Sequence, residues 1–131
     1  MPTSIESAAT GVRGAIAAYA QALDTGRSDD LAALFCPDGV AEIVGMFTFE
    51  GQDAIREGFA ALPLTEPQLH LVANTVITDW TEDSATATSD LAYFQRGEQG
   101  WAVLMVGRYD DSLRLVDGAW RFQHRVTTFR Q

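Results

Sequence analysis

The chain has 131 residues, of which 47% are hydrophobic and 10% aromatic, which is typical of one folded domain and excludes a disordered chain. A formal charge of −9 at pH 7 opposes binding to nucleic-acid phosphates or to anionic lipid, so we expect neither partner. The single cysteine, Cys36, excludes an internal disulfide and a thiolate metal cluster, and the longest apolar run, 101–106, is too short to cross a bilayer. The N-terminus lacks the basic and apolar segments of a secretion signal, so we expect a cytoplasmic protein.

Three helices are predicted in the first half of the chain. From Ser4 to Leu23, apolar residues recur every three or four positions, which is helical spacing. Ser28 begins a second, short helix, which the turn at 37–39 is expected to end. A third helix is predicted at 53–62.

The remaining segments have the alternation and β-branched content of strands. The predicted strands are 40–44, 47–50, 69–80, 85–95, 101–109 and 119–129. This order predicts a single α+β domain, 1–131, in which the helices cover one concave face of a cone-shaped, antiparallel or mixed sheet. Such an arrangement is expected to enclose a deep pocket at the mouth of the cone.

The strand 69–80 carries polar residues on an otherwise apolar face. Strict alternation places His70 and Asn74 on the same side as Val72 and Val76. A face of this kind either lines a pocket or contains polar side chains that are satisfied within a core.

Four segments of the sequence resemble the SnoaL-like branch of the nuclear transport factor two-like superfamily. They are AAYAQALDTGRSDDLAALFCPDGVAEIVG, FEGQDAIREGF, LHLVANTVI and GRYDDSLRLVDGAWRFQHR. The resemblance implies a cone-shaped fold with a deep pocket, often dimeric through the outer face of the sheet. It does not imply one activity, because the superfamily includes dehydratases, isomerases, polyketide cyclases, epoxide hydrolases and proteins that only bind or assemble.

Within this superfamily, the functional residues are most similar to those of scytalone dehydratases. Asp24 falls at the position of their helix-end aspartate, and His70 falls at the position of their first catalytic histidine. Their second histidine has no counterpart in 90–95, and Leu23 replaces their tyrosine. Ketosteroid isomerases resemble the first third of the chain, where Tyr19 matches their tyrosine. Ile43 replaces their general-base aspartate, so their chemistry is not implied.

The matched pair suits proton transfer. An imidazole such as that of His70 can remove and return one proton near neutral pH, and a carboxylate at Asp24 would orient the ring and stabilise its charged form. The alternatives are that Asp24 accepts backbone amides in the turn after its helix, and that His70 is a satisfied core residue.

Two further residues are candidates for catalysis. Alternation places His124 on the same face as Trp120 and Phe122, where it would replace the missing second histidine or form part of the core. Tyr19 would donate a hydrogen bond to a substrate oxygen or fill the core.

The remaining candidates would bind substrate. Asn74 and Tyr93 are expected to position it, and an apolar wall is expected from Phe47, Met46, Met105, Trp120 and Phe122. Asp110 and Asp111 are expected in solvent, with Arg125 on the outer face of its strand. Two histidines without close carboxylate ligands make a poor metal site, and no phosphate-binding loop is present, so we expect no metal or cofactor.

The sequence leads to three hypotheses. The first is a cofactor-independent lyase, isomerase or cyclase that acts on a small apolar carbonyl or polyketide-like molecule through Asp24 and His70. The second is a non-catalytic domain of the same fold, which binds a hydrophobic ligand or serves as a dimeric accessory subunit. The third is a structural dimerisation domain, and a cone filled by its own side chains, with no room for a ligand, would support it.

Overall fold

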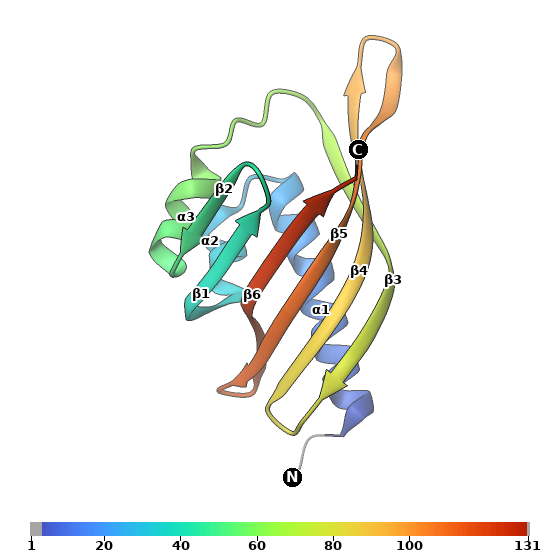
Figure 1. The fold of residues 1–131 in the computed structure, drawn as a ribbon. Helices are drawn as coiled ribbons and strands as arrows, with labels where there is room; N and C mark the ends of the chain where they lie inside the picture. The colour runs from blue at the N-terminus through green and yellow to red at the C-terminus, as the bar shows by residue number, and fades with distance from the viewer. Residues whose placement is uncertain (1–3, 131) are drawn as a thin grey trace.

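Six strands form one curved sheet in the order β2-β1-β6-β5-β4-β3 (Figure 1). The computed structural model describes residues 4–130. The strands are β1 (Phe35–Ile43), β2 (Phe47–Glu50), β3 (Gln68–Trp80), β4 (Ser84–Gly97), β5 (Gly100–Val116) and β6 (Ala119–Phe129). β1 runs parallel to β6 and all other neighbours are antiparallel. The predicted α+β class is confirmed.

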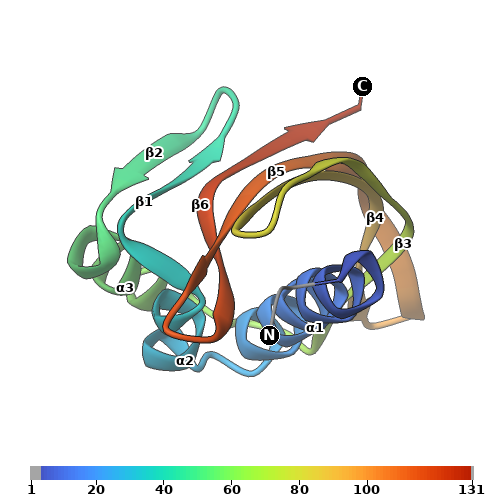
Figure 2. The same ribbon diagram turned by 90° about the horizontal axis from the view of Figure 1, so that it is seen from below.

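The helices are α1 (Ile5–Asp24), α2 (Ser28–Ala33) and α3 (Gln52–Ala60). The sheet curves around α1, whereas α2 and α3 lie at the side of β1 and β2 (Figure 2). Ser4 caps α1 by accepting a hydrogen bond from the backbone N–H of Ser7 at 3.0 Å. Beyond Asp24, Gly26 adopts a φ of 70°, which only glycine takes up without strain, and this turns the chain toward α2. None of the described helices is long and apolar enough to cross a membrane.

The segment 37–39 is part of a strand and not the predicted turn. β1 begins at Phe35, directly after α2, and its pairing with β6 is irregular between Phe35 and Val40. Pro37, which has no backbone N–H to donate, is tolerated there because the hydrogen-bond ladder between β1 and β6 is interrupted at that point.

β-Bulges change which side chains face the concave side of the sheet. In β3, Ala73 pairs with Asp90 and Val76 pairs with Thr88, so one extra residue lies between them. In β6, Gln123 is the extra residue between partners of Ser112 and Leu113. Each bulge shifts the alternation by one position, so Val76 and Ile77 in β3, and His124 and Arg125 in β6, lie on the faces opposite to the predicted ones. In β3 a second irregularity, between Ile77 and Asp79, restores the predicted faces.

The space between α1 and the sheet is largely filled. Tyr19 makes tilted or edge-on aromatic contacts with Phe35, Tyr109 and Phe122, at centroid distances of 5.9–6.2 Å. The guanidinium of Arg125 lies among the same rings, 3.4 Å from the centroid of Tyr109. The curved sheet is therefore as predicted, but the expected deep pocket is not, because core side chains fill it.

Candidate functional site

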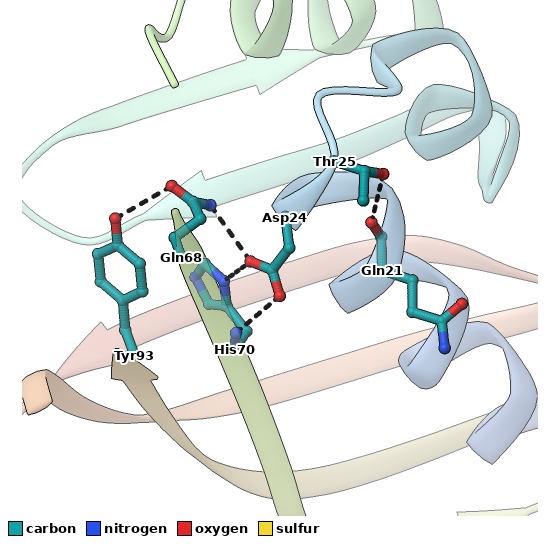
Figure 3. A network of polar contacts seen from close by, with 6 residues as sticks. All are labelled: Gln21, Asp24, Thr25, Gln68, His70 and Tyr93. Carbon is teal, nitrogen blue, oxygen red and sulfur yellow. Dashed lines mark hydrogen bonds and ion pairs between the residues drawn. The ribbon is translucent and has the colours of Figure 1, made fainter. Parts of the chain in front are cut away.

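The carboxylate of Asp24 meets the imidazole of His70 where α1 ends beside the first residues of β3 (Figure 3). Its Oδ1 lies 2.6 Å from Nδ1 of His70, and its Oδ2 accepts the backbone N–H of His70 at 2.7 Å. The two side chains are only 10% and 9% exposed. The predicted contact between these two residues is confirmed; their catalytic roles remain a prediction.

The acid–histidine contact fixes the tautomer of the ring. An ionised carboxylate only accepts hydrogen bonds, so Nδ1 of His70 carries the hydrogen that points to Asp24. In the neutral ring, Nε2 then carries the lone pair that a general base requires.

Gln68 and Tyr93 extend this contact into a network of four side chains (Figure 3). Nε2 of Gln68 donates to Oδ1 of Asp24 at 3.2 Å, and the hydroxyl of Tyr93 donates to Oε1 of Gln68 at 3.2 Å. The rings of His70 and Tyr93 stack with 4.5 Å between centroids and 14° between planes. Burial raises the pKa of Tyr93, and the negative charge of Asp24 raises it further, so the phenol keeps its proton.

Gln68 is not among the site residues predicted above, although its place in the strand was a signal for it. Gln68 precedes His70 by two positions on the same strand, and therefore points to the same face.

A small hollow adjoins this network. Its volume is about 60 Å³, and Gln68 and Leu23 line it together with the loop that follows α3, including Leu62, Pro63 and Leu64. This volume is that of about two water molecules. The loop 61–67 contributes Leu62, Pro63 and Leu64 to the wall of this hollow, so the hollow admits a larger ligand only when its wall moves.

His124 is not in this site. The prediction that its side chain faces inward is wrong. Its side chain is 43% exposed and its Nε2 lies 3.3 Å from Oε1 of Glu42 on the neighbouring strand. The bulge at Gln123 reverses the alternation after Phe122 and places His124 on the outer face.

The same bulge brings Arg125 into the core, opposite to its predicted position. Its Nε lies 3.0 Å from Oδ1 of Asp111, and both side chains are buried. Asp111 is therefore buried and not in solvent as predicted. It lies two positions after Tyr109 and two before Leu113 on β5, so alternation places all three side chains on the same face. These apolar neighbours were the signal in the sequence that Asp111 faces inward. Burial raises the pKa of Asp111 to about 6, against the opposing effect of Arg125.

Several predicted site residues belong to the core. Tyr19 and Phe122 pack against each other in the filled interior, and burial strongly raises the pKa of Tyr19. Trp120 packs on Gly11 of α1. At a rise of 1.5 Å per residue, Gly11 lies about 20 Å from Asp24 along the helix axis. Phe47 stacks on Phe49, on the side of the molecule where α3 lies. These four do not line the hollow.

The remaining predicted substrate-binding residues lie in different parts of the molecule. Asn74 lies in the β3 bulge with φ 56°, and donates to Asp90 on the exposed face at 2.9 Å, so its predicted inward direction is wrong. Met46 is 62% exposed in the β1–β2 turn, away from the hollow. Met105 pairs with Tyr93 across β4 and β5 and therefore shares its face. Tyr93 stacks on His70, and Met105 follows Tyr93 in the same row of the sheet, one strand further from the acid–histidine contact.

The described residues contain no group of three or more histidine, cysteine, aspartate or glutamate side chains arranged to hold a metal ion.

The fold of this chain is that of nuclear transport factor two-like proteins, which are also described as cystatin-like. A Novosphingobium aromaticivorans protein of that description superposes with a TM-score of 0.84 at 21% identity, covering 96% of this chain and 90% of its own. A candidate scytalone dehydratase from the same organism gives a TM-score of 0.82 at 24% identity, covering 93% and 83%. The β subunit of a candidate aromatic-ring-hydroxylating dioxygenase, again from that organism, gives 0.84 at 22% identity, covering 96% and 90%.

Within this class, the profile of the SnoaL-like domain matches residues 7–126, and the chain therefore belongs to the SnoaL-like domain family. No curated protein matches the sequence.

Proposed function

We propose that this protein is a cofactor-independent acid–base enzyme, a lyase, isomerase or cyclase, that acts on a small, largely apolar carbonyl or polyketide-like molecule. The observation that supports the proposal is the contact between Asp24 and His70, which is nearly buried and leaves Nε2 of the ring as a base. Similarity to a candidate scytalone dehydratase agrees with this class of reaction.

In the proposed mechanism, Nε2 of His70 removes a proton from the carbon next to the substrate carbonyl. The ring becomes an imidazolium, which the carboxylate of Asp24 stabilises at 2.6 Å. His70 then returns the proton, either to carbon, which completes an isomerisation, or to a departing hydroxyl, which completes a dehydration. Opening of the loop 61–67 would admit the substrate.

The proposal is tested by proton exchange in D₂O. We expect the wild-type protein to accelerate deuterium incorporation next to the carbonyl of small enolisable ketones, as followed by NMR. His70→Ala should lower this rate by about 10²–10⁴-fold, because the base is lost. Asp24→Asn should have a comparable effect, because an amide can donate to Nδ1 and stabilise the wrong tautomer.

His124→Ala is the matched control, since this second histidine lies outside the site and should leave the rate unchanged. Equal rates for the wild type, His70→Ala and Asp24→Asn would contradict the proposal.

The second candidate function is a non-catalytic accessory domain. The filled interior supports it, because Tyr19, Phe122 and Arg125 occupy the space where a ligand would lie in an open cone. The dioxygenase β subunit has the same fold. For such a domain we expect no deuterium exchange above the uncatalysed background rate with any ketone tested.

We also propose that two copies of the chain associate through the outer face of the sheet. Two adjacent rows on that face are entirely apolar across β3, β4 and β5: Leu69, Phe94 and Val103 in one, and Leu71, Ala92 and Val106 in the next. Leu69, Leu71, Val103 and Val106 are each more than 40% exposed. Contiguous apolar rows of this kind are typical of association surfaces.

A further inference from the structure

The hairpin of β4 and β5 extends past the end of β6 (Figure 1). β6 pairs with β5 from Gly107 to Val116, and beyond this range the N–H of Arg130 donates to the carbonyl of Val106 at 2.8 Å. Residues 101–106 of β5 pair with β4 on one side, with a bulge at Leu104. On their other side, no strand among residues 4–130 pairs with them, so this segment is a free edge of the sheet.

The free edge is also the longest apolar run of the sequence, WAVLMV. Its five large side chains are each 40–53% exposed: Trp101, Val103, Leu104, Met105 and Val106. The last four line an open groove of about 600 Å³, which Phe129 and Arg130 also line at the end of β6. In an antiparallel pair, alternate residues turn their main-chain N–H and C=O groups away from the partner strand, so unpaired main-chain groups run along this groove.

The other edges of the sheet are protected against pairing, as is usual in folded proteins. In β3, Asn74 lies in a bulge and the carbonyl of Thr75 accepts a hydrogen bond from the guanidinium of Arg13 at 3.1 Å. β2, at the opposite edge, has only four residues. The free edge contains no charged residue and no proline, and its one protective feature is the bulge at Leu104.

We infer that the free edge binds an extended segment of a partner protein, which adds a strand beside β5 in the position that β6 leaves vacant. The main chain of the segment would exchange hydrogen bonds with β5, and its side chains would contact the apolar groove. A segment of about six residues matches the length of the edge, since both strands have nearly the same rise per residue. This interaction does not involve Asp24 or His70 and goes beyond the proposed function.

The charge at the end of the groove indicates the chemistry of the segment. Arg130 is 61% exposed, and the carboxylate that it contacts, Asp90, is shared with Arg108. A positive charge therefore remains where the groove meets the end of β6, although the chain as a whole carries −9. The complementary partner is an apolar segment with an acidic residue at the end that reaches Arg130.

A second copy of the free edge is a poorer occupant. Antiparallel pairing of 101–106 with the same residues of another copy would place the turn of that copy, 98–100, beside 107–109. Those positions already pair with β6. A flexible segment can turn away from the sheet at Arg130, whereas the turn of a second hairpin is held in its plane.

The test is fluorescence anisotropy of the full-length protein with a labelled peptide, Asp-Val-Thr-Val-Thr-Val-Asp. A second peptide has proline in place of the central valine and cannot complete the hydrogen-bond ladder, so it should bind about tenfold more weakly. Hydrogen exchange with mass spectrometry locates the site. We expect the first peptide to slow exchange of the amides in 101–106 by about tenfold.

Leu104→Lys places a charge on the free edge and should weaken binding of the first peptide by about tenfold. Leu104 lies outside the two apolar rows proposed for dimerisation, so this variant does not alter them. Val76→Lys is the matched control, because Val76 is an equally exposed apolar residue, at 56%, on a different edge strand. It should keep the wild-type affinity.

Arg130→Glu tests the charge preference. The peptide with aspartate ends should bind this variant about tenfold more weakly than it binds the wild type, and a peptide with lysine ends should bind it about tenfold more tightly.

Three results would overturn the inference: no saturable binding of the first peptide, equal affinities of the valine and proline peptides, or slowed exchange only outside 101–106. These measurements use the wild type, so they decide the matter even when a variant does not fold. Self-association that Leu104→Lys abolishes, without peptide binding to the wild type, would identify a second copy as the occupant and would equally overturn it.

Discussion

Asp24 and Asp111 are both withdrawn from solvent, but their charges are compensated in different ways. Asp24 accepts hydrogen bonds from three N–H groups, two of His70 and one of Gln68. Asp111 is paired with the guanidinium of Arg125, among aromatic rings that provide no further hydrogen bonds to its oxygens. Charge on Asp111 is therefore poorly solvated, and its pKa is raised to about 6.

This raised pKa predicts a pH-dependent contribution to stability. Between the ordinary value of 3.8 and about 6, folded Asp111 binds a proton that the unfolded chain has released. Its contribution to the free energy of unfolding is therefore complete below that window and is lost as the pH rises through it, by up to about 3 kcal/mol at 1.36 kcal/mol per unit.

Asp111→Asn removes this titration. In urea unfolding at pH 4, 5, 6 and 7, the stability of the wild type relative to Asp111→Asn should decline across the series. Asp117→Asn, a change at an exposed aspartate that is not among the causes of the raised pKa of Asp111, should give a curve parallel to that of the wild type. Parallel curves for both variants would show that Asp111 does not titrate in this range.

At the scale of secondary structure elements, α1 and β6 meet where Trp120 packs against Gly11. A Cβ atom on Gly11 would lie 2.3 Å from Cδ1 of this indole, whereas a Cβ on Gly14 would meet nothing within 4 Å. The two glycines therefore differ in their surroundings, although they are three residues apart on one helix.

Alanine substitutions at the two positions should have opposite effects. Gly11→Ala forces the indole away and should lower the free energy of unfolding by about 1–3 kcal/mol. Gly14→Ala gains helix propensity without a clash and should raise it by about 0.5–1 kcal/mol. Chemical denaturation measures both values, and a stabilised Gly11→Ala would contradict the close packing of α1 on β6.

The elements themselves were largely predictable from the sequence, because a period of two or of three to four residues reports directly on strands and helices. The contact between Asp24 and His70 came from the resemblance, since no local pattern joins residues so far apart in the chain. His124 and Asn74 were placed on the wrong faces because single-residue bulges reverse alternation. The identity of Asn74 was a hint of the bulge in β3, because asparagine tolerates a positive φ. The identity of Gln123 gave no such hint of the bulge in β6.

At the scale of the whole molecule, apolar surface is concentrated at one end of the outer face of the sheet. The next row along is polar, with Asp90 held by Arg108 and Arg130. A patch that has both an apolar centre and a border with both charges can be complementary to itself, as a two-fold interface requires.

We therefore predict a dimer in sedimentation velocity experiments. Leu71→Glu and Val106→Glu should each convert it to a monomer, because burial of an unpaired charge opposes association. Thr86→Glu, at an exposed position of β4 outside the two apolar rows, should remain dimeric. A wild-type monomer at micromolar concentration would contradict the proposed interface.

The last residue of α1 is acidic, and no basic residue lies in its final turn, although the carbonyl end of a helix disfavours negative charge. The donors that offset this charge all come from Gln68 and His70, at the start of β3. The helix end and the strand start should consequently open as one cooperative unit. In native-state hydrogen exchange, amides at 22–25 and 68–71 should share a single opening free energy, and two distinct values would show that each is held independently.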